Sequence, residues 1–216
     1  MPIYVKRFTL CENAGDVASG PVVAHVLGEP PTVVDLARRL GPNLLAIGSI
    51  LTSADEQSIV WGSGFIVVGA QLAATPKAIL AVRGELTRAE LHKQGIACDP
   101  ILGDPGVFIP DIYPRGSARW SVGLVPHYVD LDDPFVEAAR AAGARIINPL
   151  SPFDTFISEL GACERIISSS LHGLIFAHAY GIPAVWLEIS DRVIGDGSSF
   201  VTTTHQSACM ATTFLV

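Results

Sequence analysis

Short apolar strands alternate with short helices along the second half of the chain, and this alternation restricts the fold more than any other feature of the sequence. Strands are expected at residues 121–125, 145–148, 165–168 and 184–187, and helices at residues 134–142, from 151 onward and at 171–180. Gly143 ends the first helix, while Ser151 and Pro152 open the second as N-cap and first helical residue. Strands that alternate with helices in this way form a parallel, Rossmann-like sheet.

The first half of the chain shows the same alternation less regularly. Strands are expected at residues 3–8, 44–47, 58–61 and 77–82, and a helix is expected from Val17. Thr87 and Glu90 have the spacing of a capping box, which predicts a helix that starts there and ends at Gly95. The predicted fold class is therefore α/β, with two Rossmann-like lobes.

The boundary between the lobes is predicted from composition. Residues 109–119 are rich in Pro, Gly and polar residues and carry no periodicity, which is typical of a linker. The domains are then an N-terminal α/β lobe at residues 1–108 and a C-terminal Rossmann-like lobe at residues 120–216. Two lobes joined in this way are expected to leave a cleft for substrates. The last residues, SSFVTTTHQSACMATTFLV, hold five Thr and no charge, so a truncated or atypical C-terminus is expected.

Composition excludes several classes of protein. The net charge is −7 and no cluster of Lys and Arg is present, so binding of nucleic acid through a basic surface is not expected. The four cysteines show no CxxC spacing and predict neither a disulfide framework nor a zinc site. The apolar runs are too short for a transmembrane segment, and the N-terminus lacks the apolar core of a signal peptide. A cytoplasmic protein is expected.

The sequence SSSLHGLIFAHAYGIP, at residues 168–183, contains the clearest candidate site. A strand leads into three serines, and His172 follows on the first turn of the next helix. Ligands of open α/β sheets bind at the carboxyl ends of the strands, and the first turn of a helix favours an anion. His172 is therefore a candidate acid or base, and the candidate ligand contacts around it are Ser169, Ser170, Leu171 and Gly173. The alternative is that a serine only caps the helix and His172 is a surface residue.

A second histidine is expected at the same edge of the sheet. His127 follows the first strand of the second lobe in the sequence VPHY. Because the carboxyl ends of parallel strands meet at one edge, His127 and His172 are expected to converge there. Histidine exchanges protons near neutral pH, so both are candidate catalytic residues.

Two candidate binding elements lie in the first lobe. Gly62, Ser63 and Gly64 follow a strand, and the glycines would let the backbone approach a ligand closely. A tight turn is the alternative. Arg83 ends the next strand, where it could bind a phosphate or carboxylate in bidentate fashion. A surface ion pair is the alternative for Arg83.

A polar turn near the N-terminus is the last candidate. Asn13 and Asp16 lie in it, directly before a predicted helix. Asp16 could bind a ligand there or could simply cap the helix.

These motifs, taken in order, resemble the polysaccharide pyruvyl transferase family, in the branch that acts on bacterial exopolysaccharides. The resemblance covers about residues 3–197 and is carried by NAGD, WGSG, VRGELTRAELHKQGI, GDPG, VPHY, SSSLHGLIFAHAYGIP and SDRVIGDG. It implies a fold similar to the two-lobed B-type glycosyltransferases, in agreement with the two lobes expected from the alternation of strands and helices.

The resemblance also implies a reaction. Pyruvate would pass from phosphoenolpyruvate to two hydroxyls of a sugar as a cyclic ketal, with release of phosphate. The family's catalytic histidine falls on His172, its anion-binding arginine on Arg83, and its polar turn on Asn13, Gly15 and Asp16. No cofactor or metal is required. The acceptor would be a saccharide of an exopolysaccharide or cell-surface glycan precursor, for example one that is lipid-linked at a membrane surface.

The chain departs from the family pattern in two places, and two other functions stay open. Several relatives carry Arg where this chain has Ser170, and relatives usually continue well beyond the segment SDRVIGDG. A nucleotide-sugar glycosyltransferase could use the same two-lobed fold, with Glu188 and Asp191 as the carboxylates nearest to the second sheet edge. A non-catalytic, truncated relative is the other alternative.

Overall fold

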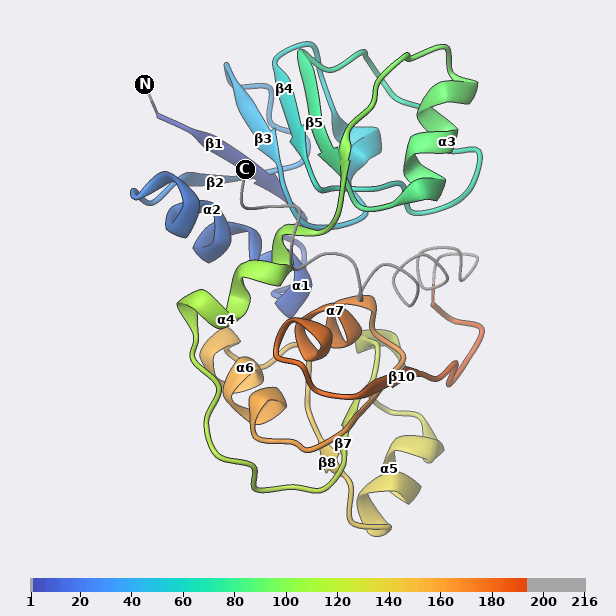
Figure 1. Cartoon of the computed structure of the whole chain (residues 1–216). Coiled ribbons are helices and arrows are strands. Elements are labelled where there is room, and N and C mark those ends of the chain that lie inside the picture. Colours follow the sequence, from blue (N-terminus) through green and yellow to red (C-terminus); the bar gives the residue numbers. More distant parts are fainter. Residues whose placement is uncertain (1, 194–216) are drawn as a thin grey trace. The chain divides into compact units, whose positions relative to one another are not determined.

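The computed structural model describes residues 2–193, which divide into two compact units (Figure 1). The first unit contains residues 2–10 and 18–105, and the second contains residues 11–17 and 106–193. Each unit holds one parallel sheet with flanking helices, so the predicted α/β class with Rossmann-like lobes is confirmed. The sequence did not predict that residues 11–17 belong to the second unit. The prediction of a truncated or atypical C-terminus concerns residues outside the described range.

The first unit is built on a six-stranded parallel sheet with the strand order β2-β1-β3-β4-β5-β6. The strands are β1 (Tyr4–Arg7), β2 (Thr32–Asp35), β3 (Asn43–Leu45), β4 (Ser58–Trp61), β5 (Ala78–Val82) and β6 (Ile101–Leu102). β1, β4 and β5 lie where they were predicted, β3 ends two residues earlier than predicted, and β2 and β6 were missed. β2 directly follows two prolines and β6 has two residues, so neither shows a readable alternation.

The helices of the first unit are α2 (Ser19–Leu27) and α3 (Glu85–Lys93), with a short 3₁₀ helix, η1, at Leu51–Ser53. The predicted start of α3 at Thr87 is wrong, because the helix begins at Glu85 with Gly84 in the N-cap position. Glu90 does not close a capping box, since its carboxylate accepts a hydrogen bond from Gly69 N at 3.1 Å. Gly95 follows the helix with a φ of 77°, as its predicted role requires.

The second unit is built on a four-stranded parallel sheet with the strand order β10-β9-β7-β8. Its strands are β7 (Gly123–Val125), β8 (Arg145–Ile146), β9 (Ile166–Ser168) and β10 (Ala184–Trp186). Its helices are α1 (Ala14–Val17), α4 (Ile109–Ile112), α5 (Pro134–Ala141), α6 (Phe153–Gly161) and α7 (Leu171–Ala179), with a 3₁₀ helix, η3, at Tyr128–Asp130. Another 3₁₀ helix, η2 (Pro105–Phe108), begins at the last residue of the first unit. None of the helices within residues 2–193 is long and apolar enough to cross a membrane.

Two predictions for the second unit need correction. Part of the predicted linker is helical, since it begins with α4, which packs against α7. Arg115 then donates hydrogen bonds to the carbonyl oxygens of Gly161 and Cys163 at 3.0 and 2.9 Å, so this segment is fixed to the second unit. The cap of α6 lies one residue later than predicted, because Pro152 occupies the N-cap position and the helix begins at Phe153.

The strand order identifies one edge in each unit as the place for a ligand. Read from β8, the second sheet has the order β8-β7-β9-β10, which matches β2-β1-β3-β4 in the first unit. In both sheets the order of the strands changes direction between two neighbouring strands, β1 and β3 in the first unit and β7 and β9 in the second. Ligands of such sheets bind at the carboxyl ends of the two strands that flank this reversal. In the second unit these strands are β7 and β9, which lead to His127 and His172.

Candidate active site

His172 is the second residue of α7, at the carboxyl end of β9. The turn before it is held by Ser168, whose hydroxyl oxygen accepts a hydrogen bond from Ser170 N at 3.0 Å and lies 2.9 Å from Val125 O. Ser170 occupies the N-cap position but makes no side-chain hydrogen bond to the helix, so it does not cap α7. His172 itself is partly buried.

Gly173 allows α7 to lie directly against the strands. A Cβ atom at this position would overlap Ser168 Oγ and would come within 2.9 Å of Val125 Cγ1. A larger residue would therefore push the first turn of α7, and His172 with it, away from the sheet. Gly173 was predicted as a ligand contact, and the structure gives it this packing role.

The N-terminal polar turn packs onto the His172 ring within the second unit. A Cβ atom at Gly15 would overlap Nδ1 of His172, so the backbone of α1 lies against the imidazole. The turn is held by a hydrogen bond from Ala14 N to Pro149 O at 2.8 Å and by one from Asn13 Nδ2 to Asp16 Oδ2 at 3.0 Å. Asp16 is the third residue of α1 and therefore not its N-cap. The structure thus brings the predicted residues Asn13 and Asp16 to the same edge as His172.

Ser169 links the two histidine-bearing loops. Its hydroxyl oxygen accepts a hydrogen bond from His127 N at 2.7 Å and donates one to Asp130 Oδ2 at 3.2 Å. Asp130 is completely buried and also accepts a hydrogen bond from Ser190 Oγ at 2.5 Å. The loops that follow β7, β9 and β10 are therefore tied to one carboxylate.

Asp130 was not predicted as a site residue, although it lies only three residues after His127. An aspartate in a loop is usually a solvated residue, and no local pattern distinguishes a buried one from an exposed one. Arg192 contributes to the same network, because its guanidinium lies 3.5 Å from Asp130 Oδ1 and 2.9 Å from Asp133 Oδ2.

His127 is held as a neutral side chain. Burial lowers its pKa, and the nearby Asp130 carboxylate opposes this shift without cancelling it. Its Nδ1 accepts a hydrogen bond from Val129 N at 3.4 Å, which leaves the ring proton on Nε2. At neutral pH His127 can therefore donate a hydrogen bond through Nε2.

Arg83 lies at the carboxyl end of β5 in the first unit, as predicted, but it is buried with 6% of its surface exposed. Nη1 donates to Ser49 Oγ at 2.7 Å and Nη2 donates to Phe65 O at 2.8 Å. Burial lowers the pKa of Arg83 and the Asp104 carboxylate raises it, and an arginine in a protein stays charged. The alternative of an exposed surface ion pair is therefore wrong. The guanidinium connects the loops that follow β3 and β4.

The Gly62-Ser63-Gly64 segment forms a tightly packed loop. A Cβ atom at Gly62, whose φ is 112°, would overlap Pro105, and one at Gly64 would lie 2.9 Å from Thr87 Oγ1. The glycines are thus required by close packing within the unit. Ser63 is completely buried, and its hydroxyl has no hydrogen-bond partner among residues 2–193.

Replacing Arg83 by Ala is expected to lower the free energy of unfolding by about 1–3 kcal/mol, because the buried Phe65 carbonyl and Ser49 hydroxyl lose their donor. Arg83→Lys should recover only part of this loss, because a single ammonium cannot reproduce the planar guanidinium fork. Denaturant unfolding measures both variants. Arg88→Ala, which removes an exposed ion pair with Glu85, should change stability by less than about 0.5 kcal/mol. Wild-type stability of Arg83→Ala would show that the guanidinium does not hold these loops.

Within residues 2–193, no group of three or more His, Cys, Asp or Glu side chains is placed to hold a metal ion. Asp130 and Asp133, the carboxylates nearest to the Ser169 network, both pair with Arg192.

Known proteins resemble this chain over most of its length. The family profile described as "Polysaccharide pyruvyl transferase" matches residues 38–191, a segment that includes Arg83, His127 and His172. "Uncharacterized protein L143" of Acanthamoeba polyphaga mimivirus is 27% identical over 194 residues, which cover 86% of this chain and 67% of that protein. "Succinoglycan biosynthesis protein ExoV" of Rhizobium meliloti (strain 1021) is 30% identical over 156 residues, or 68% of this chain and 48% of that protein. The matched part thus spans about half the length of ExoV.

Proposed function

Because this chain belongs to the polysaccharide pyruvyl transferase family, we propose that it transfers pyruvate from phosphoenolpyruvate to two hydroxyls of a saccharide as a cyclic ketal. The acceptor is proposed to be an exopolysaccharide or cell-surface glycan precursor. The similarity to a protein named for succinoglycan biosynthesis supports this class of acceptor. No cofactor is included in the proposal.

The reaction has two proton transfers that a protein must assist. Both sugar oxygens form bonds to C2 of the enolpyruvate, and the bond between C2 and the phosphate oxygen breaks. Of the two hydroxyl protons, one is taken up by the methylene carbon, which becomes a methyl group, and the other leaves with the phosphate. Histidine can donate and accept protons at neutral pH, so it suits both transfers.

The position of His172 carries the proposal. The residue lies on the first turn of α7, a helix of nine residues, at the reversal point of the second sheet. The N–H groups of that turn and the helix dipole favour an anionic ligand, and the donor carries a carboxylate and a phosphate. We assign His172 as the acid or base and His127 as a second proton-transfer or hydrogen-bonding residue. The proposed substrate contacts in the second unit are Ser169, Ser170, Leu171, Asn13 and Asp16.

The proposal is tested by incubating the chain with phosphoenolpyruvate and candidate glycans. Phosphate release should depend on the glycan, and the product should gain the mass of one pyruvate less one water. A glycan with one hydroxyl of the acceptor pair methylated should be inert, because a cyclic ketal needs both oxygens. Transfer of a sugar from a nucleotide-sugar in the absence of phosphoenolpyruvate would instead identify a glycosyltransferase.

A further inference from the structure

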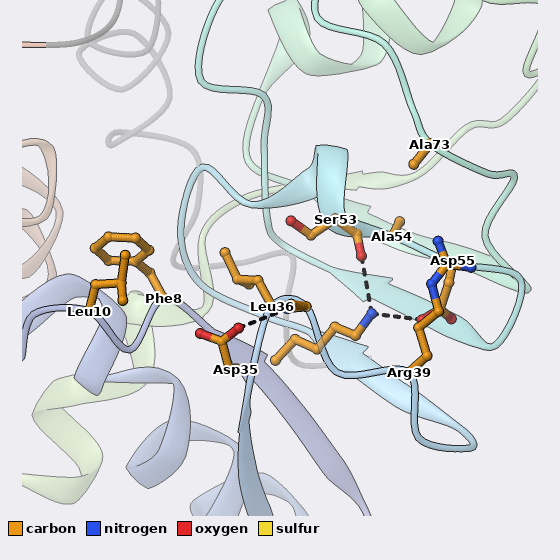
Figure 2. A pocket seen from close by; sticks show the side chains of 11 residues that line it. Phe8, Leu10, Asp35, Leu36, Arg39, Ser53, Ala54, Asp55 and Ala73 are labelled. Atoms are coloured by element: carbon orange, nitrogen blue, oxygen red, sulfur yellow. Dashed lines mark hydrogen bonds and ion pairs between the residues drawn. The ribbon is translucent and has the colours of Figure 1, made fainter.

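A pocket of about 430 Å³ lies in the first unit and contains none of the candidate site residues (Figure 2). Its volume falls in the range of small-molecule sites. It is lined by Lys6, Phe8, Leu10, Asp35, Leu36, Ala37, Arg39, Ser53, Ala54, Asp55 and Ala73. We propose that this pocket binds a neutral saccharide unit.

A buried ion pair forms part of the wall. Lys6 lies in β1 with 1% of its surface exposed, and its ammonium donates to Asp55 Oδ2 at 2.7 Å and to Ser53 O at 3.1 Å (Figure 2). Asp55 is also held by Asn43 Nδ2 at 3.0 Å and by Gln57 N at 2.9 Å. These contacts fix the polar groups before any ligand arrives, which lowers the entropy cost of binding.

The other two charged residues of the lining, Asp35 and Arg39, are held by fewer contacts. The Asp35 carboxylate accepts hydrogen bonds from Thr9 Oγ1 at 2.6 Å and from Ala37 N at 2.9 Å, which orient its oxygens. Arg39 is exposed and forms no hydrogen bond or ion pair with another residue of the described range 2–193. Its guanidinium can therefore donate to a ligand without breaking a contact in the protein.

Apolar side chains complete the lining. Phe8 supplies an aromatic ring, and Leu10, which follows it in the chain, has 85% of its surface exposed. Figure 2 shows both on the side of the pocket opposite to Arg39 and Asp55. Phe8 is partly buried, so the lining combines a fixed aromatic ring with the exposed Leu10 side chain.

The charges of the lining decide the class of ligand. Lys6 and Arg39 are balanced by Asp35 and Asp55, so the pocket has no net charge and does not favour an anion or a cation. It offers both donors and acceptors together with an aromatic surface. A sugar ring matches this set, because its hydroxyls both donate and accept hydrogen bonds while its C–H faces pack on aromatic rings. If the proposed function holds, the bound unit is a sugar of the acceptor that is not itself pyruvylated.

Saccharide binding is tested directly, in the absence of phosphoenolpyruvate. Saturation-transfer NMR and calorimetry with lactose, maltose and cellobiose should detect binding of at least one disaccharide to the full chain. Arg39→Ala should weaken that affinity at least fivefold, and Ala73→Trp should block the pocket sterically at an exposed position. Arg38→Ala is the matched control, since Arg38 neighbours Arg39 but does not line the pocket. It should bind like wild type.

The outcomes separate this inference from the proposed function. Absence of disaccharide binding, or binding that Arg39→Ala and Ala73→Trp leave unchanged, would overturn the inference even if pyruvyl transfer is observed. Binding of inorganic phosphate that Arg39→Ala abolishes would also overturn it in favour of an anion site. Disaccharide binding that both substitutions weaken supports the inference even if no ketal is formed. Only the role as acceptor subsite would then be withdrawn.

Discussion

Replacing His172 by Gln is expected to reduce kcat for pyruvyl transfer by about 100- to 10,000-fold, the range typical for loss of a general acid or base. Glutamine keeps the hydrogen-bonding capacity of the side chain but cannot carry a proton at neutral pH. The imidazole is partly buried beneath Gly15, so a side chain of similar length should be accommodated. We therefore expect the fold to be retained and the loss to appear in kcat.

The measurement is phosphate release at saturating phosphoenolpyruvate and acceptor. His178→Gln is the matched control, because His178 lies in the last turn of the same helix, at the end opposite to the candidate site. Its turnover should stay within a few-fold of wild type. Near-wild-type turnover by a folded His172→Gln protein would refute the assignment and make His127→Gln the next variant to measure.

Replacing Lys6 by Met is expected to lower the free energy of unfolding by about 3–5 kcal/mol, because it leaves the buried Asp55 carboxylate without its countercharge. The two side chains are 2% and 7% exposed and lie 2.7 Å apart. Solvent therefore cannot replace the lost partner. Denaturant unfolding of wild type and variant at neutral pH measures the difference.

Two comparisons test whether the loss comes from the ion pair. Lys93→Met removes a cation that is 65% exposed from its contact with Glu90, and it should cost less than about 1 kcal/mol. Lys6→Met combined with Asp55→Asn should be less destabilised than the sum of the single variants, since the buried charge is then absent. A loss below about 1 kcal/mol for Lys6→Met would contradict the prediction.

The same pair predicts the direction of the pH dependence. Burial raises the pKa of Asp55, but hydrogen bonds from Lys6 and Asn43 outweigh this and lower it from 3.8 to about 2. A carboxylate with a lowered pKa stabilises the folded state above its ordinary pKa and loses that contribution as the pH falls through the lowered value. Stability of the wild type should therefore fall between about pH 4 and pH 2, and Lys6→Met should show a weaker dependence there.

Local sequence patterns were sufficient for the architecture and for part of the site. The strands β4 and β9 contain runs of apolar residues, and the helices between strands end at glycines with positive φ such as Gly95 and Gly143. Because strands that alternate with helices must form a parallel sheet, the carboxyl edges that carry Arg83, His127 and His172 could be predicted from the order of elements alone. The start of α3 was misplaced, because Thr87 packs against Gly64 instead of capping the helix.

Only the tertiary structure decided which distant residues meet. Gly15 packs onto His172, Asp130 accepts a hydrogen bond from Ser169, and Lys6 is buried beside Asp55. In each case the partners lie at least 39 positions apart in the chain. Periodicity reports only which face of an element is apolar, so a lysine in a strand or an aspartate in a loop is predicted to face solvent. Burial of these charges depends on long-range contacts that satisfy them, and such contacts exist only once the chain has folded.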